Sequence, residues 1–160
     1  MNKMFLSAAV GLSLLGSIIA SPVGTTVESD IPLGQAVPLV NKEATVITSI
    51  QLDKGNWVIS GGAQFSEQLP QTVVGTQKLN ISAWISPVIT FNHQGAYARD
   101  SRQYSPPFDG LIPLPITNRV FKLTQDTTIY FVARSAWQSF GANAPTTQAG
   151  FGRILATRVP

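Results

Sequence analysis

Apolar and polar residues alternate with a period of two along much of this chain, and this alternation constrains the fold more than any other feature. Residues 57–65, 78–86 and 127–137 show it most clearly. Successive side chains of an extended strand point to opposite faces, so each segment predicts a strand with one face turned to a core. In the first segment the predicted core face consists of Trp57, Ile59, Gly61, Ala63 and Phe65.

Shorter apolar runs between turn residues complete an all-β pattern. They cover residues 36–40, 44–52, 111–117, 119–123 and 151–159. The prolines at 113 and 115 favour an edge strand or an extended connector, and the Gly61-Gly62 pair favours a bulge or a close approach of another backbone or ring. Only 12% of residues are charged, whereas there are 13 glycines and 11 prolines, a balance typical of turn-rich β proteins. We expect an antiparallel two-sheet jelly-roll sandwich of about eight strands.

The first twenty residues differ from the rest of the chain. One cation, Lys3, precedes an apolar run that ends before Ala20-Ser21-Pro22. The run is short for a bilayer span, so this layout predicts a signal peptide cut after Ala20. A retained membrane anchor is the alternative, because isoleucine at the third position before the cut is less usual than alanine. We therefore expect a leader over 1–20, a flexible linker over 21–33 and one β domain over 34–160. The protein would be exported to the periplasm or beyond, or reside in a virion.

Residues that could support catalysis are sparse. There is no cysteine, His93 is the single histidine, and no nucleophile elbow or zinc motif occurs. Asp100 and Asp109 are the only loop acids that suggest paired carboxylates, and both are better explained by local turns or ion pairing. The net charge is +3 with the basic residues scattered singly, which argues against nucleic-acid binding. We expect no enzyme activity, cofactor or metal.

The long polar segment over 87–110 is the best candidate for binding. It combines aromatic and guanidinium groups, which supply flat apolar faces and directional donors for sugar or protein surfaces. The predicted ligand-binding residues are Tyr97, Arg99, Arg102 and Tyr104.

Three segments together resemble a family of small phage and prophage β-domain proteins found among virion-associated genes. They are TSIQLDKGNWVISG at 48–61, TTIYFVAR at 127–134 and GRILATRV at 152–159. The resemblance implies a domain similar to the trimeric tumour-necrosis-factor and C1q heads, with Trp84 and Tyr130 as exposed subunit contacts. Members of that family usually lack a hydrophobic leader, so residues 1–20 are a departure that suits export or contact with a membrane.

Two functional hypotheses follow. The first is a non-enzymatic phage or prophage structural protein, a homotrimer that displays loops for attachment to other virion proteins or to a host glycan or protein. The second is a secreted or periplasmic bacterial module that binds carbohydrate or protein.

Overall fold

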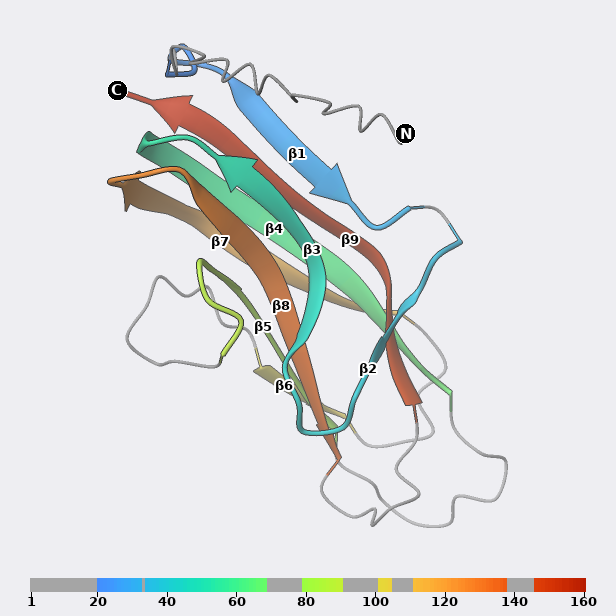
Figure 1. The fold of residues 1–160 in the computed structure, drawn as a ribbon. Helices are drawn as coiled ribbons and strands as arrows, with labels where there is room; N and C mark the ends of the chain where they lie inside the picture. Colours follow the sequence, from blue (N-terminus) through green and yellow to red (C-terminus); the bar gives the residue numbers. More distant parts are fainter. Residues whose placement is uncertain (1–19, 33, 69–78, 91–100, 105–110, 138–145) are drawn as a thin grey trace, which may run out of the picture.

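The structure is a computed structural model that describes residues 20–32, 34–68, 79–90, 101–104, 111–137 and 146–160. These residues form two antiparallel sheets that lie one over the other (Figure 1). The strands are β1 (Thr26–Asp30), β2 (Val37–Leu39), β3 (Thr45–Leu52), β4 (Gly55–Gln68), β5 (Leu79–Ser86), β6 (Ser101–Tyr104), β7 (Ile112–Leu123), β8 (Thr127–Trp137) and β9 (Thr146–Val159).

The order of the strands is that of a jelly roll. One sheet runs β1-β9-β4-β7, with β2 also paired to β9, and the other runs β3-β8-β5-β6. Because β1 pairs with residues 153–157 of β9 and β2 with residues 147–149, the two short strands are successive parts of one edge. Counted this way, the described chain fills eight strand positions whose connections cross repeatedly between the sheets. The predicted all-β jelly-roll sandwich is confirmed.

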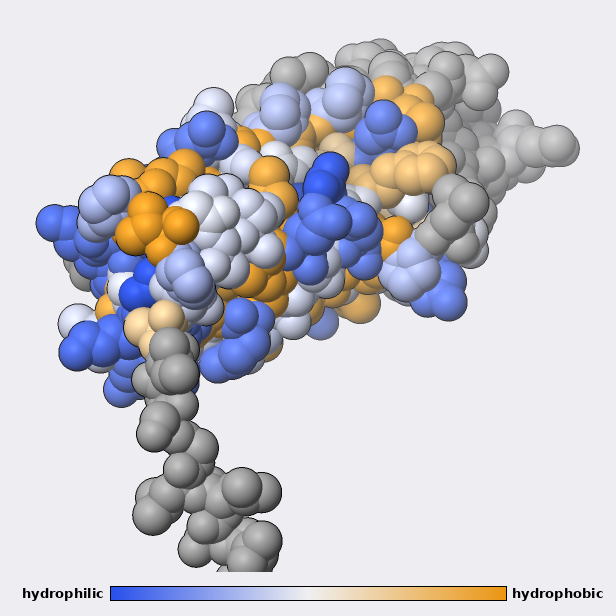
Figure 2. Space-filling view, turned by 90° about the horizontal axis from the view of Figure 1, so that it is seen from above, coloured by the Kyte–Doolittle hydropathy of each residue, from blue (hydrophilic) through white to orange (hydrophobic). Residues whose placement is uncertain are grey.

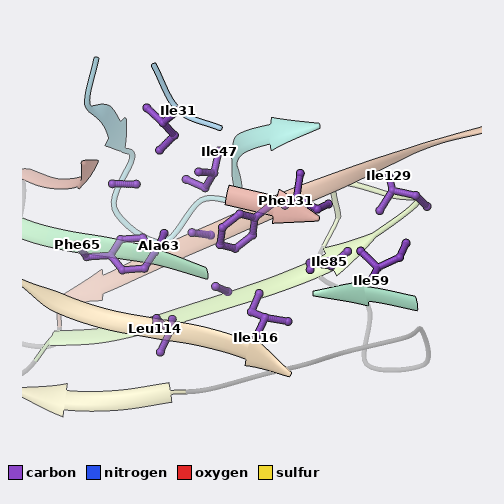
Figure 3. Close-up of a cluster of buried hydrophobic side chains, with 14 of the residues drawn as sticks. Ile31, Ile47, Ile59, Ala63, Phe65, Ile85, Leu114, Ile116, Ile129 and Phe131 are labelled. Carbon is purple, nitrogen blue, oxygen red and sulfur yellow. The ribbon is translucent and has the colours of Figure 1, made fainter. Parts of the chain in front are cut away.

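The core lies between the two sheets and consists of the side chains that alternation assigned to it. Figure 3 shows Phe65 and Leu114 from one sheet gathered with Ile85 and Phe131 from the other. Trp57, Ile59, Ala63 and Phe65 of the predicted core face of β4 are buried, and so is the aliphatic face of β5. Burial of such side chains stabilises a fold by roughly 1.5–3 kcal/mol each, which suffices without disulfides.

Gly61 confirms the expectation of a bulge and a close backbone approach. The β4–β7 register shifts between Ile59 and Gly61. A Cβ atom built on Gly61 would lie 2.7 Å from the carbonyl oxygen of Arg153 and 3.2 Å from Cδ1 of Ile85. Only glycine lets the neighbouring strand and the opposite sheet come this close, so this residue is required by packing.

The prolines of β7 also lie where the sequence places them. β7 is the last strand of its sheet, so Pro113 and Pro115, which lack an N–H, remove no hydrogen bond from an interior ladder. The two runs predicted over 111–117 and 119–123 form this single edge strand.

The predicted linker over 21–33 is corrected. Residues 26–30 form β1, which pairs with residues 153–157 of β9, and the next residue, Ile31, is buried in the core. The strand was missed because only Val27 in it is apolar, and an edge strand with one half-buried face needs little apolar sequence. The β domain therefore includes residues that precede position 34.

Trp84 has a different environment from the one expected. Its side chain points away from the intersheet core, and it stands opposite Val132 of β8 in the register. Trp84 is nevertheless only 1% exposed. Tyr130 is half-buried, opposite Ser49 and Ser86. An exposed Trp84, the expectation for a subunit contact, is therefore not found.

Candidate functional site

An open groove of about 510 Å³ lies on the outer face of the β1-β9-β4-β7 sheet. Alternation explains which side chains line it. Ala63 and Phe65 of β4 point into the core, so Gly62 and Gln64 between them point outward. The neighbouring strands add Pro113, Pro115, Phe151 and Arg153, which stand opposite Gly62 or Gln64 in the register.

Gly62 forms the floor of this groove. A Cβ atom built there would meet only ordinary contacts, the carbonyl oxygen of Leu114 and Cα of Pro115, both at 3.4 Å. Packing therefore does not demand glycine at this position, in contrast to Gly61 beside it. The hollow exists because the central strand lacks a side chain where its two neighbours have large ones.

The lining of the groove combines apolar and polar side chains. Phe151 is 50% exposed and presents apolar surface to solvent. Gln64 stands beside it in the register and offers an amide donor and acceptor. A flat apolar group next to directional hydrogen-bonding groups suits a sugar ring or a protein side chain.

Charged residues border the groove where β9 meets β1. The guanidinium group of Arg153 donates to a carboxylate oxygen of Glu28, and its Nε lies 3.5 Å from Oδ1 of Asp30. The hydrogen bond and negative charge of Glu28 raise the pKa of Arg153 above its already high value. All three side chains are more than half exposed, so they present both signs of charge to solvent.

On the face seen from above in Figure 2, apolar and polar side chains form small interleaved patches rather than one continuous surface of either kind. Apolar side chains that are about half exposed also occur on or next to β7, at Leu111 and Val120.

A second hollow, of about 490 Å³, lies at one end of the sandwich. Ala20 and Gly55 line it together with four charged residues from two turns and β9, namely Asp53, Lys54, Asp126 and Arg158. Its central interaction joins Arg158 Nη1 to Asp53 Oδ2 at 2.7 Å. The same guanidinium donates to the carbonyl oxygen of Lys54 at 3.0 Å and lies 5.6 Å from the ring centre of Trp57. These contacts tie the β3–β4 turn to the last strand.

The described residues that line the two hollows do not include the predicted ligand-binding residues. Tyr97 and Arg99 lie outside the described residues, as do His93, Asp100 and Asp109. Arg102 and Tyr104 belong to β6, the edge strand of the other sheet, where the backbone alone is described. Arg102 and Tyr104 therefore belong to a different sheet from the one that carries the groove.

Sequence reasoning missed the groove. The available signal was the combination of Gly62 in a strand and prolines at alternate positions of another strand, but nothing in the sequence shows that these two strands are neighbours. In the described part of the chain, no three histidine, aspartate or glutamate side chains come together in a way that could hold a metal ion. The described residues also contain no helix with the length and apolar character needed to cross a membrane.

Comparison with known proteins finds similarity in fold alone. No family model matches the chain, and no curated protein matches it by sequence. Among solved structures, a VP2 protein of infectious bursal disease virus in derived T=1 particles has a TM-score of 0.50 and 13% identity, covering 95% of this chain and 36% of that one. The structure of the Gx strain of the same virus has a TM-score of 0.48 and 14% identity, covering 95% and 38%.

This chain thus spans well under half the length of the viral chains to which it is similar. At this level of identity the similarity to the T=1 particle protein extends to the fold and no further.

Proposed function

We propose that this protein is a non-enzymatic structural component of a phage or prophage-encoded virus particle, with its jelly-roll domain as the unit of assembly. The observation that carries the proposal is the complete jelly-roll strand order, which this chain has in common with a protein found in T=1 virus particles. The resemblance of residues 48–61, 127–134 and 152–159 to phage β-domain proteins supports the same role.

The protein would reside in a virion or in the cell envelope. Loops of the domain would be displayed for attachment or assembly, to other virion proteins or to a host glycan or protein. The expected assembly is a homotrimer. Trp84 is buried within one chain, so a trimer must use other surfaces, among them the half-buried Tyr130.

Mass spectrometry of purified particles tests this function directly. We expect peptides of this chain in particles produced by a strain that carries the gene, at a copy number comparable to that of other structural proteins. Particles that form without the protein, and in which none of its peptides is detected, would contradict the proposal. Light scattering of the purified protein tests the trimer separately, because a monomer at all concentrations excludes it.

A second candidate function, a secreted or periplasmic binding module, is supported by the outer-face groove. Phe151 and Gln64 place an exposed ring beside hydrogen-bonding groups, an arrangement suited to carbohydrate or protein ligands. A glycan array is the probe. Binding that Phe151→Ala removes and Val120→Ala retains would support this function, since Val120 is an exposed apolar residue outside the groove lining. The predicted cluster is tested in parallel by Tyr97→Ala and Tyr104→Ala.

A further inference from the structure

The backbone nitrogen of Ser21 lies against the carboxylate of Asp53, which belongs to the β3–β4 turn. It donates to Oδ2 of Asp53 at 2.6 Å, and the same carboxylate oxygen accepts from Arg158 at 2.7 Å. The second oxygen, Oδ1 of Asp53, is buried and has no hydrogen-bond partner in the structure. A buried carboxylate oxygen without a hydrogen-bond donor costs free energy. A group with more N–H donors than the single amide of Ser21 could satisfy it.

Ser21 is held at this place by a short turn against the last strand. Gly24 donates its N–H to the carbonyl oxygen of Arg158 at 2.9 Å, and the N–H of Arg158 donates to the carbonyl oxygen of Thr25 at 2.8 Å. The N–H of Thr25 also closes back onto the carbonyl oxygen of Pro22 at 3.1 Å. Gly24 has a φ of 89°, a conformation that favours glycine. Four consecutive residues therefore fix the direction in which Ser21 approaches Asp53.

The residue before Ser21 is the one at which the sequence predicts that a leader ends. Ala20 is small and exposed, and follows the apolar run that resembles a signal segment. The sequence argument and the hydrogen bond to Asp53 are independent, and both single out the same peptide bond.

We propose that the chain is cut between Ala20 and Ser21 and that the α-ammonium group released on Ser21 forms an ion pair with Asp53. In the cut, a leader peptidase adds water across the peptide bond. The carbonyl carbon of Ala20 gains the hydroxyl group, and the C–N bond breaks. The nitrogen of Ser21 leaves as an amine and takes up protons to become an ammonium group.

The ammonium group has three N–H donors where the amide had one. One donor keeps the contact with Oδ2 of Asp53, and another can turn to Oδ1 of the same carboxylate. The carboxylate then lies between two cations, Ser21 and Arg158. The processed end of the chain thereby closes the corner at which the β3–β4 turn and the end of β9 meet.

The other charged groups around this corner leave Asp53 as the partner of the new ammonium. Lys54 is the cation of the β3–β4 turn, and Asp126 of the β7–β8 turn accepts from the backbone N–H of Lys54 at 3.0 Å. Asp126 is thus a carboxylate of the same hollow that accepts from Lys54, whereas Asp53 already accepts from the nitrogen of Ser21 and keeps a buried oxygen without a donor. This makes Asp126 a matched control.

The cut itself is tested on the full chain produced in a bacterium with a working export pathway. N-terminal sequencing and intact mass of the purified protein should give Ser21 as the first residue. A protein that begins at Met1, or at any other residue, overturns the proposal. This result is independent of whether the protein is part of a virus particle.

The ion pair is tested on the processed protein by the pH dependence of its N-terminal labelling with an amine-reactive reagent, read by peptide mass spectrometry. An exposed α-amino group has a pKa of about 7.7–8.0, and pairing with a carboxylate raises it. At pH 8 we expect labelling about tenfold slower than that of a free peptide that starts Ser-Pro-Val-Gly. Equal labelling rates for the protein and the peptide overturn the pairing.

Two variants assign the effect to one carboxylate. Asp53→Asn should bring the labelling rate up to that of the free peptide, and Asp126→Asn should leave the protected rate unchanged. Protection that survives Asp53→Asn, or that Asp126→Asn removes, contradicts the assignment. If Asp53→Asn does not fold, the comparison of the unaltered protein with the peptide still decides the matter.

Discussion

Two arginines of the same strand, Arg158 and Arg153, make ion pairs in opposite settings. Arg158 and its partner Asp53 have side chains that are 13% and 17% exposed, and the pair also contacts Trp57 and the backbone of Lys54. Arg153 and its partner Glu28 are 56% and 52% exposed on the outer face of the sheet.

The difference shows that a carboxylate within reach says little about what an arginine contributes. Water screens the Arg153 pair and competes for its donors, so the pair contributes little to stability. The Arg158 pair is largely removed from water, and each partner would lose its counter-charge and a charged hydrogen bond if the other were deleted. We therefore regard Asp53–Arg158 as a structural lock and Arg153–Glu28 as part of a solvated rim.

Among the variants that test this comparison, Arg158→Ala is expected to have the largest effect on stability. The variant leaves the largely buried carboxylate of Asp53 without its counter-charge and removes the cation–π contact with Trp57. We expect a loss of about 3 kcal/mol in the free energy of unfolding, measured by urea denaturation. A loss below about 1 kcal/mol would place this pair in the same class as Arg153.

The adjacent glycines of β4 sharpen the contrast between the inside and the outer face. Gly61→Ala forces the backbone at Arg153 to move and should cost about 2 kcal/mol, because a Cβ atom overpacks a rigid site. Gly62→Ala is the matched control and should change stability by less than about 0.5 kcal/mol. Equal losses in the two variants would show that the groove floor is as constrained as the core.

The pH dependence of stability tests the Asp53–Arg158 pair in another way. Burial raises the pKa of Asp53, but the hydrogen bond from Ser21 and the charge and hydrogen bond of Arg158 outweigh it, so the pKa lies below its ordinary value of 3.8. A lowered folded pKa adds stability above the unfolded value that is lost as the pH falls through the folded one.

The advantage of the unaltered protein over Asp53→Asn should therefore be complete at pH 6 and shrink below about pH 4. Thermal melts between pH 2 and pH 7 measure it. A difference that stays constant over this range would mean that the charge of Asp53 does not stabilise the fold.

The smallest expected effect is that of Arg153→Ala. Its partners are solvated, so the change in the free energy of unfolding should be close to the error of a urea titration, and added salt should reduce even that. Glu28→Ala should behave alike. A loss near that of Arg158→Ala would show that the rim supports the pairing of β1 with β9 and would end the distinction between the two arginines.

Much of the fold could be predicted because burial leaves a period of two in the sequence. The strand over Thr127–Trp137 has the predicted bounds, and the core face of β4 is the predicted one. β1 could not be found in this way, since an edge strand with one apolar residue has no such period. β6 was missed for a similar reason, because Ser101–Tyr104 is polar.

The candidate sites were less predictable because they depend on which strands become neighbours. Gln64 and Phe151 are distant in the sequence, and only the pairing of β4 with β9 places them side by side. Ser21 and Asp53 meet for the same kind of reason, through the turn that holds residues 21–25 against Arg158.

The sequence by itself determined that the chain forms strands, which side of most strands is buried, and that the Gly61-Gly62 pair serves a bulge or a close approach. These properties are local, since they depend on the order of polar and apolar residues along a few residues of extended chain. The tertiary structure alone decided which arginine is buried, which glycine floors a groove and which carboxylate meets Ser21. Those properties depend on strand order and register, which bring together residues that no local pattern connects.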